Sequence, residues 1–246
     1  MSSAPTFIAH RGEASRYPEN TVVALQGAID GGIRHLEFDV QLSADRVPVL
    51  SHDAVLTRTA GLERIVSAGL AAELTDIGVG EVSRFGDTFQ SQRLPSLQRV
   101  LQALESAPPL HLFVELKRHS LRAFGRQRVI EAALPLLRTS PHKITVISFD
   151  YDVLELLQSI DGLGTGWVLS AYDDAAKVRL QALSPDFVFC NQVRLPPRGL
   201  LWQGSWHWAI YEIASISEVH TLLERGASHF ESMRAAELKR QWHDQV

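Results

Sequence analysis

The chain of 246 residues has 24 basic and 28 acidic side chains, a net charge of −4, and 45% hydrophobic residues. This composition is typical of a globular protein with a large core, and it offers no basic field for nucleic acid or anionic lipid. The single cysteine, Cys190, excludes an intramolecular disulfide and a cysteine-based zinc site. The sequence shows neither a signal peptide nor a run of about 20 apolar residues, so we expect a cytoplasmic protein without stable membrane association.

Eight short, apolar, β-rich runs follow one another along the chain, each with helix-like sequence after it. They span residues 6–10, 35–42, 111–117, 143–149, 164–169, 186–190, 207–213 and 227–231. From the fourth run to the seventh, the starts lie 21 or 22 residues apart, which leaves room for one strand, one helix and two short loops. The pattern predicts a single α/β domain, residues 1–246, folded as a (β/α)8 TIM barrel. An open doubly wound sheet is disfavoured because the first turn lacks its glycine-rich phosphate loop.

The first predicted helix follows the turn after residues 6–10. Its apolar residues Val22, Leu25 and Ile29 repeat at helical spacing, with Asn20 or Thr21 as the N-cap. The interval after the second strand is much longer than the others, and its segment of about 53–94 is rich in glycine. We interpret this segment as an insertion on one rim of the barrel, where insertions often shape a substrate mouth.

Two prolines bear on the later helices. Pro95 is expected to begin the helix at 97–104, because proline is tolerated where a helix starts. Pro135 lies inside an otherwise helical stretch and is expected to kink or divide the third helix.

Carboxylates gather on two of the predicted strands. In HLEFDVQL, Glu37 and Asp39 lie two residues apart and so face the same side, which in a barrel is the interior; in HLFVELK, Glu115 and Lys117 do the same. Like charges inside a protein are costly unless a cation lies among them. The three carboxylates therefore predict a divalent cation with oxygen ligands, either Mg²⁺ or Ca²⁺.

Two histidines end neighbouring extended segments near these acids. His10 and Arg11 follow the first strand, and His52 follows the short run VPVLS. One imidazole could deprotonate a nucleophile while the other protonates a leaving oxygen. Arg11 suits a phosphate oxygen pair, although an ion pair with Glu19 is an equal alternative.

Aromatic residues supply the remaining candidates for the mouth. Phe149 ends the fourth strand, and Trp208 is expected to line the mouth from the seventh. The motifs of α/β-hydrolases, zincin proteases and P-loop enzymes are absent from the sequence.

Five motifs in order along the chain resemble the glycerophosphodiester phosphodiesterase family. They are AHRG at 9–12, PENT at 18–21, EFDV at 37–40, PVLSHD at 48–53 and ELK at 115–117. Weaker matches extend the resemblance over nearly the whole chain. It implies a (β/α)8 barrel that uses a divalent metal to hydrolyse glycerophosphodiesters, such as glycerophosphocholine or glycerophosphoethanolamine, to sn-glycerol 3-phosphate and an alcohol.

The resemblance also implies a role for each matching residue. The metal ligands would be Glu37, Asp39 and Glu115, the acid/base pair His10 and His52, and the phosphate contacts Arg11 and Lys117. The insertion after His52 would form a small cap beside the site. The family suggests attack on phosphorus by the substrate's own 2-hydroxyl; direct attack by water is the alternative, and we favour His10 as base and His52 as acid.

The last two strands depart from the family's pattern. Where members often have W-T-V-N, this chain has Trp208-Ala-Ile-Tyr211, and the usual I-T-D-x-P is replaced by Glu231-Ser232-Met233. The family's specificity toward the glycerol and the alcohol is therefore not assigned to this chain. The alternatives to a small-molecule glycerophosphodiester substrate are a phospholipase D-type barrel acting on lysophospholipids or sphingolipids, and a catalytically silent binding barrel.

Overall fold

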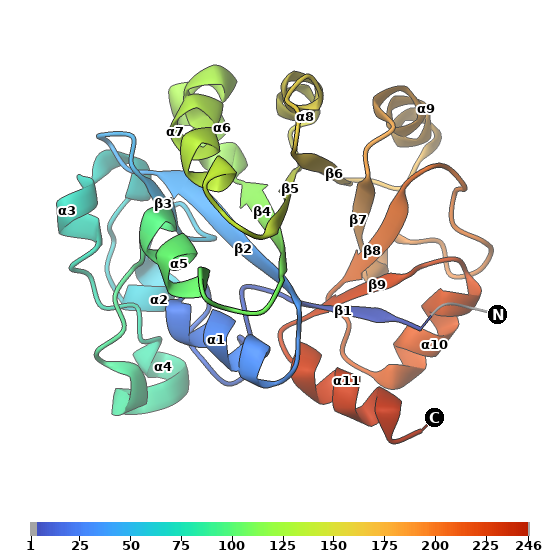
Figure 1. The fold of residues 1–246 in the computed structure, drawn as a ribbon, viewed down its shortest axis with the longest axis horizontal. Coiled ribbons are helices and arrows are strands. Elements are labelled where there is room, and N and C mark those ends of the chain that lie inside the picture. Colours follow the sequence, from blue (N-terminus) through green and yellow to red (C-terminus); the bar gives the residue numbers. More distant parts are fainter. Residues whose placement is uncertain (1–3, 246) are drawn as a thin grey trace.

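Eight parallel strands close into a barrel in the computed structural model, which describes residues 4–245 (Figure 1). The strands follow the order β1-β9-β8-β7-β6-β5-β4-β2, and pairing of β1 with β2 closes the ring. This confirms the predicted (β/α)8 barrel. Residues 1–3 and 246 of the predicted domain lie outside the described part of the chain. The strands are β1 (Thr6–Ala9), β2 (His35–Leu42), β4 (His111–Leu116), β5 (Lys143–Ser148), β6 (Gly164–Val168), β7 (Phe187–Asn191), β8 (His207–Tyr211) and β9 (His229–Ser232).

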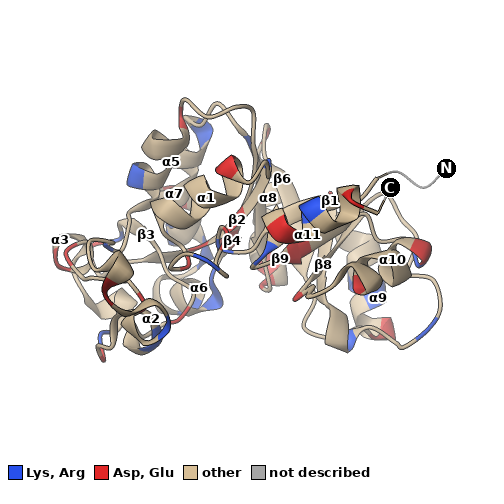
Figure 2. Cartoon of the chain, turned by 90° about the horizontal axis from the view of Figure 1, so that it is seen from below, with Lys and Arg blue, Asp and Glu red and all other residues tan. Residues whose placement is uncertain are grey.

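Helices surround the barrel and cover the outward-facing residues of the strands (Figure 1). Lysine or arginine and aspartate or glutamate occur together on the same helices, as on α9 and α11 (Figure 2). Within residues 4–245, none of the helices has both the length and the apolar character needed to cross a bilayer. The covering helices are α1 (Val22–Asp30), α5 (Leu97–Leu104), α6 (Arg118–Phe124), α7 (Arg126–Arg138), α8 (Tyr151–Gln158), α9 (Asp174–Leu183), α10 (Ile216–Glu224) and α11 (Ala235–His243), with a 3-10 turn η3 (Gln192–Arg194) after β7.

The turn between β1 and α1 packs tightly against the helix it precedes. Thr21 is the N-cap of α1, since its side chain accepts from the Ala24 amide at 3.3 Å. Gly12 has a φ of +82°, and a Cβ there would lie 2.5 Å from the Ala24 carbonyl carbon. Only glycine fits this approach, which holds the turn that follows His10 against the helix.

The helical segment after β4 is divided, but at a different residue from the one predicted. Gly125, with a φ of +85°, separates α6 from α7. The α7 helix continues through Pro135 to Arg138, so Pro135 does not divide it, and the alternative of a kink at Pro135 stays a prediction. The α5 helix spans Leu97–Leu104 as predicted, with Ser96 as its N-cap, directly after Pro95.

A short ninth strand precedes the insertion. β3 (Pro48–Leu50) pairs antiparallel with the end of β2 and leads to His52. The segment 53–94 then forms α2 (Thr57–Ala60), η1 (Val66–Ala68), α3 (Ala71–Leu74), α4 (Val82–Phe85) and η2 (Gly86–Phe89), which lie together on one side of the barrel (Figure 1). These elements share a small apolar cluster of their own, formed by Val49, Leu56, Val66, Leu74, Val79 and Leu94.

Apolar residues fill the middle of the barrel and separate its two ends. Inward-facing residues Ile8, Phe113, Ile147, Val168, Phe187, Phe189 and Ala209 form this layer. At the amino ends of the strands, four histidines, His35, His111, His207 and His229, lie with neighbouring rings 5.5 to 5.9 Å apart. At the carboxyl ends, acidic and basic side chains meet instead, and enzymes with this fold react at that end.

Candidate active site

Three buried carboxylates from two adjacent strands meet at the carboxyl end of the barrel. Glu37 and Asp39 come from β2 and Glu115 from β4, where Asp39 and Glu115 are partners in register. One oxygen of each lies within 4.8 Å of the others. The structure thus brings together the three acids expected from the sequence, in a set that could hold a divalent cation.

Two buried cations balance part of this charge. Lys117 Nζ lies 3.0 Å from Asp39 Oδ1 and 2.9 Å from Glu115 Oε1. Arg11 Nε lies 3.3 Å from Asp39 Oδ2, while its Nη1 donates to Glu19 Oε1 at 3.0 Å. Arg11 therefore faces the acidic cluster and also makes the ion pair with Glu19 that was the alternative.

The three carboxylates differ in pKa because burial and the neighbouring charges act on each of them differently. Burial opposes the charge on Asp39, but Lys117 and Arg11 outweigh it and hold the Asp39 pKa well below its usual range. Burial and the charge of Asp39 raise the Glu37 pKa well above its usual range. Burial also raises the pKa of Glu115 to about 7, against the opposing charge of Lys117. Such crowded acids favour a cation among them.

The β1–α1 loop supports the acidic cluster with two left-handed residues. Arg11 has a φ of 55°, and its amide donates to Glu37 Oε2 at 2.9 Å. Asn20, with a φ of 56°, donates from Nδ2 to Asp39 Oδ2 at 2.8 Å and accepts from the Asp39 amide at 3.0 Å. Non-glycine residues rarely adopt this conformation, so tertiary contacts hold the strain here.

His10 is buried at the end of β1, between two acids. Its Nε2 lies 3.6 Å from Glu231 Oε1 and 4.0 Å from Glu37 Oε2. Its Nδ1 has no hydrogen-bond partner within the described residues, and Glu212 Oε1 is 4.0 Å away. Burial and then the charge of Arg11 lower the His10 pKa well below its usual value, which favours the neutral form that can accept a proton.

His52 reaches the mouth on the segment after β3. Its Nδ1 lies 2.7 Å from Asp53 Oδ1, and Arg58 Nε donates to the other Asp53 oxygen at 2.8 Å. Gln41 donates from Nε2 to the carbonyls of Ser51, His52 and Asp53, which fixes the backbone there. Burial lowers the His52 pKa, although the charge of Asp39 raises it in part.

The insertion is tied to the site through Glu19. Arg58 of α2 donates to both Glu19 carboxylate oxygens, at 2.6 and 2.7 Å. Glu81, buried before α4, accepts from the Glu19 amide at 2.7 Å. Because Glu19 also holds Arg11, the segment 53–94 connects to the phosphate-contact candidate through one shared carboxylate.

The two aromatic candidates occupy different layers. Phe149 packs partly buried against the barrel interior, with the Arg118 guanidinium 4.8 Å from its ring centre. Trp208 does not line the mouth as expected: it packs in the outer core, and its Nε1 donates to the Trp202 carbonyl at 2.8 Å. On β8 the inward-facing residues are Ala209 and Tyr211. The Tyr211 ring lies 6.5 Å from that of His10.

Several supporting residues were not identified from the sequence. Gln41 continues the inward-facing set of Glu37 and Asp39 on β2, so the two-residue period could have revealed it. Glu231 stands at an inward position of the last strand, and its departure from the family pattern was the available signal. Asn20 lies in the PENT motif at 18–21, which was the available signal, but its contact with Asp39 depends on tertiary structure.

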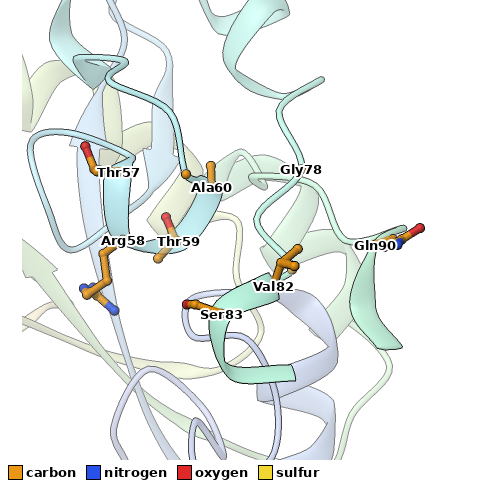
Figure 3. Close-up of a pocket in the computed structure, with 10 residues that line it drawn as sticks. Thr57, Arg58, Thr59, Ala60, Gly78, Val82, Ser83 and Gln90 are labelled. Carbon is orange, nitrogen blue, oxygen red and sulfur yellow. The ribbon is translucent and has the colours of Figure 1, made fainter. Parts of the chain in front are cut away.

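A depression in the insertion lies apart from the acidic cluster. It encloses about 420 Å³ between α2, which contributes Thr57 to Ala60, and α4, which contributes Val82 and Ser83 (Figure 3). Its only charged lining residue among those described is Arg58, whose guanidinium is held by Glu19 and Asp53. This depression offers no acid, base or metal ligand of its own.

Solved structures with the same architecture support the fold. The phosphodiesterase from Oleispira antarctica in complex with the product sn-glycerol-3-phosphate superposes with a TM-score of 0.85 at 24% identity, covering 98% of this chain and 97% of that one. A glycerophosphodiester phosphodiesterase from Thermotoga maritima gives a TM-score of 0.69 at 17% identity, over 98% and 100% of the two chains. At these identities the likeness shows the fold.

Sequence comparison identifies the family. A glycerophosphodiester phosphodiesterase from Caldanaerobacter subterraneus is 35% identical over 97 residues, 39% of each chain. One from Bacillus altitudinis is 28% identical over 155 residues, 63% of this chain and 62% of that one. These matches span less than two thirds of the relatives' length. The family model described as glycerophosphoryl diester phosphodiesterase matches residues 10–193, which include the three acids and both histidines. Because this match covers well over half of its length, the chain belongs to the glycerophosphoryl diester phosphodiesterase family.

Proposed function

We propose that the protein hydrolyses glycerophosphodiesters to sn-glycerol 3-phosphate and an alcohol, with the aid of a divalent cation. The observation that carries this proposal is the meeting of Glu37, Asp39 and Glu115 with Arg11 and Lys117 at the reactive end of the barrel. An acidic cation site flanked by two fixed cations suits a phosphodiester anion, since each of its nonbridging oxygens needs a positive partner.

The donor set fits Mg²⁺ or Ca²⁺. All three oxygens come from buried carboxylates, which are the ligands that hard cations prefer. Lys117 Nζ already lies between Asp39 and Glu115, so the cluster attracts positive charge. When bound, the ion would neutralise phosphate charge and polarise the phosphorus centre.

The chain's own groups then bind the phosphate and move protons. Arg11 and Lys117 would hold the nonbridging oxygens. His10 would take the proton of the glycerol 2-hydroxyl as that oxygen attacks phosphorus, and His52 would protonate the departing alcohol oxygen. We favour the 2-hydroxyl over water as nucleophile because an intramolecular group gains from proximity. Water would then open the cyclic phosphate, with the histidines exchanging roles.

The segment 53–94 would serve as a small cap within a single domain. Its contacts with Glu19 through Arg58 and Glu81 support this proposal, because they hold the segment beside the loop that carries Arg11. In that position it would border the alcohol side of the substrate.

The decisive experiment measures release of sn-glycerol 3-phosphate from glycerophosphocholine. We expect turnover in Mg²⁺ or Ca²⁺, its loss in excess chelator, and its return when the cation is restored. Micellar lysophospholipid serves as the comparison substrate. Chelator-resistant turnover would contradict the metal proposal, and hydrolysis of lysophospholipid alone would favour the phospholipase D-type alternative.

A further inference from the structure

A fourth buried carboxylate faces the site from the last strand. Glu231 lies on β9, where Phe230 packs in the outer core and Glu231 points to the barrel interior. It is 3% exposed. One of its oxygens lies within 4.8 Å of ligand atoms of both His10 and Glu37. Glu231 therefore extends the acidic wall past β1, on the side away from Lys117.

Among the described residues, Glu231 pairs with no lysine or arginine. Lys117 pairs with Asp39 and Glu115, and Arg58 pairs with Glu19. In the part of the chain that the structure describes, the one ion-pair contact of Glu231 is with His10 Nε2, at 3.6 Å. That distance is too long for a strong hydrogen bond. Within residues 4–245, no group donates a hydrogen bond to the Glu231 carboxylate oxygens. The Glu231 oxygens are not among the fully shielded atoms that lack a partner, so they open toward the site, where a donor brought by a ligand could reach them.

The surroundings restrict what that donor can be. On one side of Glu231 are Glu37 and His10, and on the other the apolar wall of Ala209 and Tyr211. A phosphodiester oxygen carries no hydrogen and so cannot be this donor. A small neutral donor attached to carbon fits both the acid and the apolar wall, and a hydroxyl group on an alkyl chain is such a donor.

We propose that Glu231 accepts a hydrogen bond from the terminal sn-1 hydroxyl of the substrate's glycerol, and so selects phosphodiesters of unacylated glycerol. This inference rests on the proposed function. If the 2-hydroxyl is directed toward Glu37 and His10, the neighbouring hydroxyl on the adjacent carbon falls within reach of Glu231. A 1-acyl lysophospholipid has an ester at that position and cannot donate. A site built around a buried acceptor rejects analogues that lack the donor.

The test compares two substrates that differ by one oxygen atom. These are glycerophosphocholine and its analogue in which the terminal hydroxyl is replaced by hydrogen, 2-hydroxypropyl phosphocholine. We expect the native enzyme to prefer the first by about 10- to 100-fold in kcat/KM, as for the loss of a partner from a largely buried polar group. Glu231→Leu should abolish this preference by slowing only the first substrate. Glu231→Gln keeps an acceptor oxygen and should retain part of the preference.

A binding measurement separates recognition from turnover. Calorimetric titration should give the native protein a higher affinity for sn-glycerol 3-phosphate than for 2-hydroxypropyl phosphate, and Glu231→Leu equal affinities. The matched control is Glu212→Gln, which removes a solvent-exposed carboxylate 4.0 Å from the other nitrogen of His10. It should leave the preference unchanged.

Two results from the native enzyme and Glu231→Leu would overturn the inference. One is a native enzyme that turns over both substrates equally, and the other is a Glu231→Leu protein that is slowed equally on both. Loss of the preference in Glu212→Gln would also contradict it, since a general effect of acidic charge would then explain the result. A native enzyme inactive on both diesters would instead refute the proposed function itself.

Discussion

Asn20 and Glu19 hold the charged groups of the site without belonging to the acidic cluster. Asn20 contacts both the amide and the carboxylate of Asp39, so it fixes where that charge points. Glu19 fixes the Arg11 guanidinium in the same way. Such supporting contacts often influence a metal or phosphate site nearly as strongly as the ligands do.

Replacing Asn20 should weaken metal binding without unfolding the barrel. Asn20→Gly permits the left-handed backbone and removes both contacts with Asp39. We expect the affinity for Mg²⁺ or Ca²⁺ to fall by about 10- to 100-fold, measured by calorimetric titration. Asn191→Gly, at the end of β7, is the control, because its side chain contacts Val193 instead. Unchanged metal affinity in Asn20→Gly would show that metal binding does not depend on the hydrogen bonds between Asn20 and Asp39.

His52 should be required for turnover. His52→Ala removes the proposed proton donor, and kcat should fall by roughly two orders of magnitude, with little change in the melting temperature because the side chain is one third exposed. His243→Ala, an exposed histidine at the end of α11, provides the control and should retain activity. Near-normal turnover of glycerophosphocholine by His52→Ala would refute its role as acid.

At the scale of elements, the β1–α1 loop and the insertion depend on each other. Arg58 of α2 and Glu81 before α4 both bind Glu19, although 39 and 62 residues separate them from it in the chain. The Glu19 side chain is almost fully buried, while the Arg58 side chain is about half exposed. Loss of Arg58 would leave a buried acid with Arg11 as its remaining cation.

Two arginine variants in the insertion test how much stability the contact with the buried Glu19 provides. Arg58→Ala should lower the free energy of unfolding by about 1–3 kcal/mol, because it removes a partner from a buried carboxylate. Arg64→Ala breaks a pair with Glu73, whose side chain is about half exposed instead of buried, and should cost at most about 1 kcal/mol. Urea unfolding measures both. Equal losses would mean that the Glu19 contact adds nothing beyond an ordinary surface pair.

Strand and helix positions were largely predictable because their patterns are local. The period of two on β2 predicted the shared face of Glu37 and Asp39, and the apolar spacing predicted α1. Trp208 was assigned to the wrong face because β8 is covered by helices and apolar on both sides, so its sequence does not show which side is inward. The contacts of Asn20 and Gln41 join distant segments, which no local pattern reveals.

For the molecule as a whole, the barrel separates two ends of different chemistry. The carboxyl end holds the charged site, and the amino end holds the histidines around Phe187. Burial lowers the pKa of His35 to about 4 and those of His111 and His229 to about 3. These imidazoles are therefore neutral in the folded protein at pH 7.

The histidine end should make stability depend on pH. Above the unfolded pKa of about 6.5, the three imidazoles are neutral in both states and contribute no pH dependence. Below it, the unfolded chain binds protons that the folded barrel does not, so the free energy of unfolding falls with pH. Each histidine contributes up to about 1.4 kcal/mol per pH unit until its folded pKa is reached.

Urea unfolding of the native protein and His229→Gln, from about pH 7 to pH 5, checks this expectation. The variant should lose stability less steeply on acidification, because one of the three amino-end imidazoles that bind a proton only on unfolding is gone. His220→Gln, on the exposed side of α10, should keep the native slope. Parallel curves for the native protein and His229→Gln would show that the amino-end histidines do not control acid stability.

The insertion also leaves and rejoins the barrel at one place. Its first residues follow β3, and its last precede Ser96, which bridges Val49 of β3, while the Leu50 amide donates to the Pro95 carbonyl at 2.9 Å. Changing the length of a long flexible loop whose ends are adjacent costs little loop-closure entropy, about 0.6 kcal/mol for each doubling. Replacing the insertion with a longer or shorter segment should therefore leave the barrel folded and alter which alcohols are accepted. The replacement must still offer partners for Glu19.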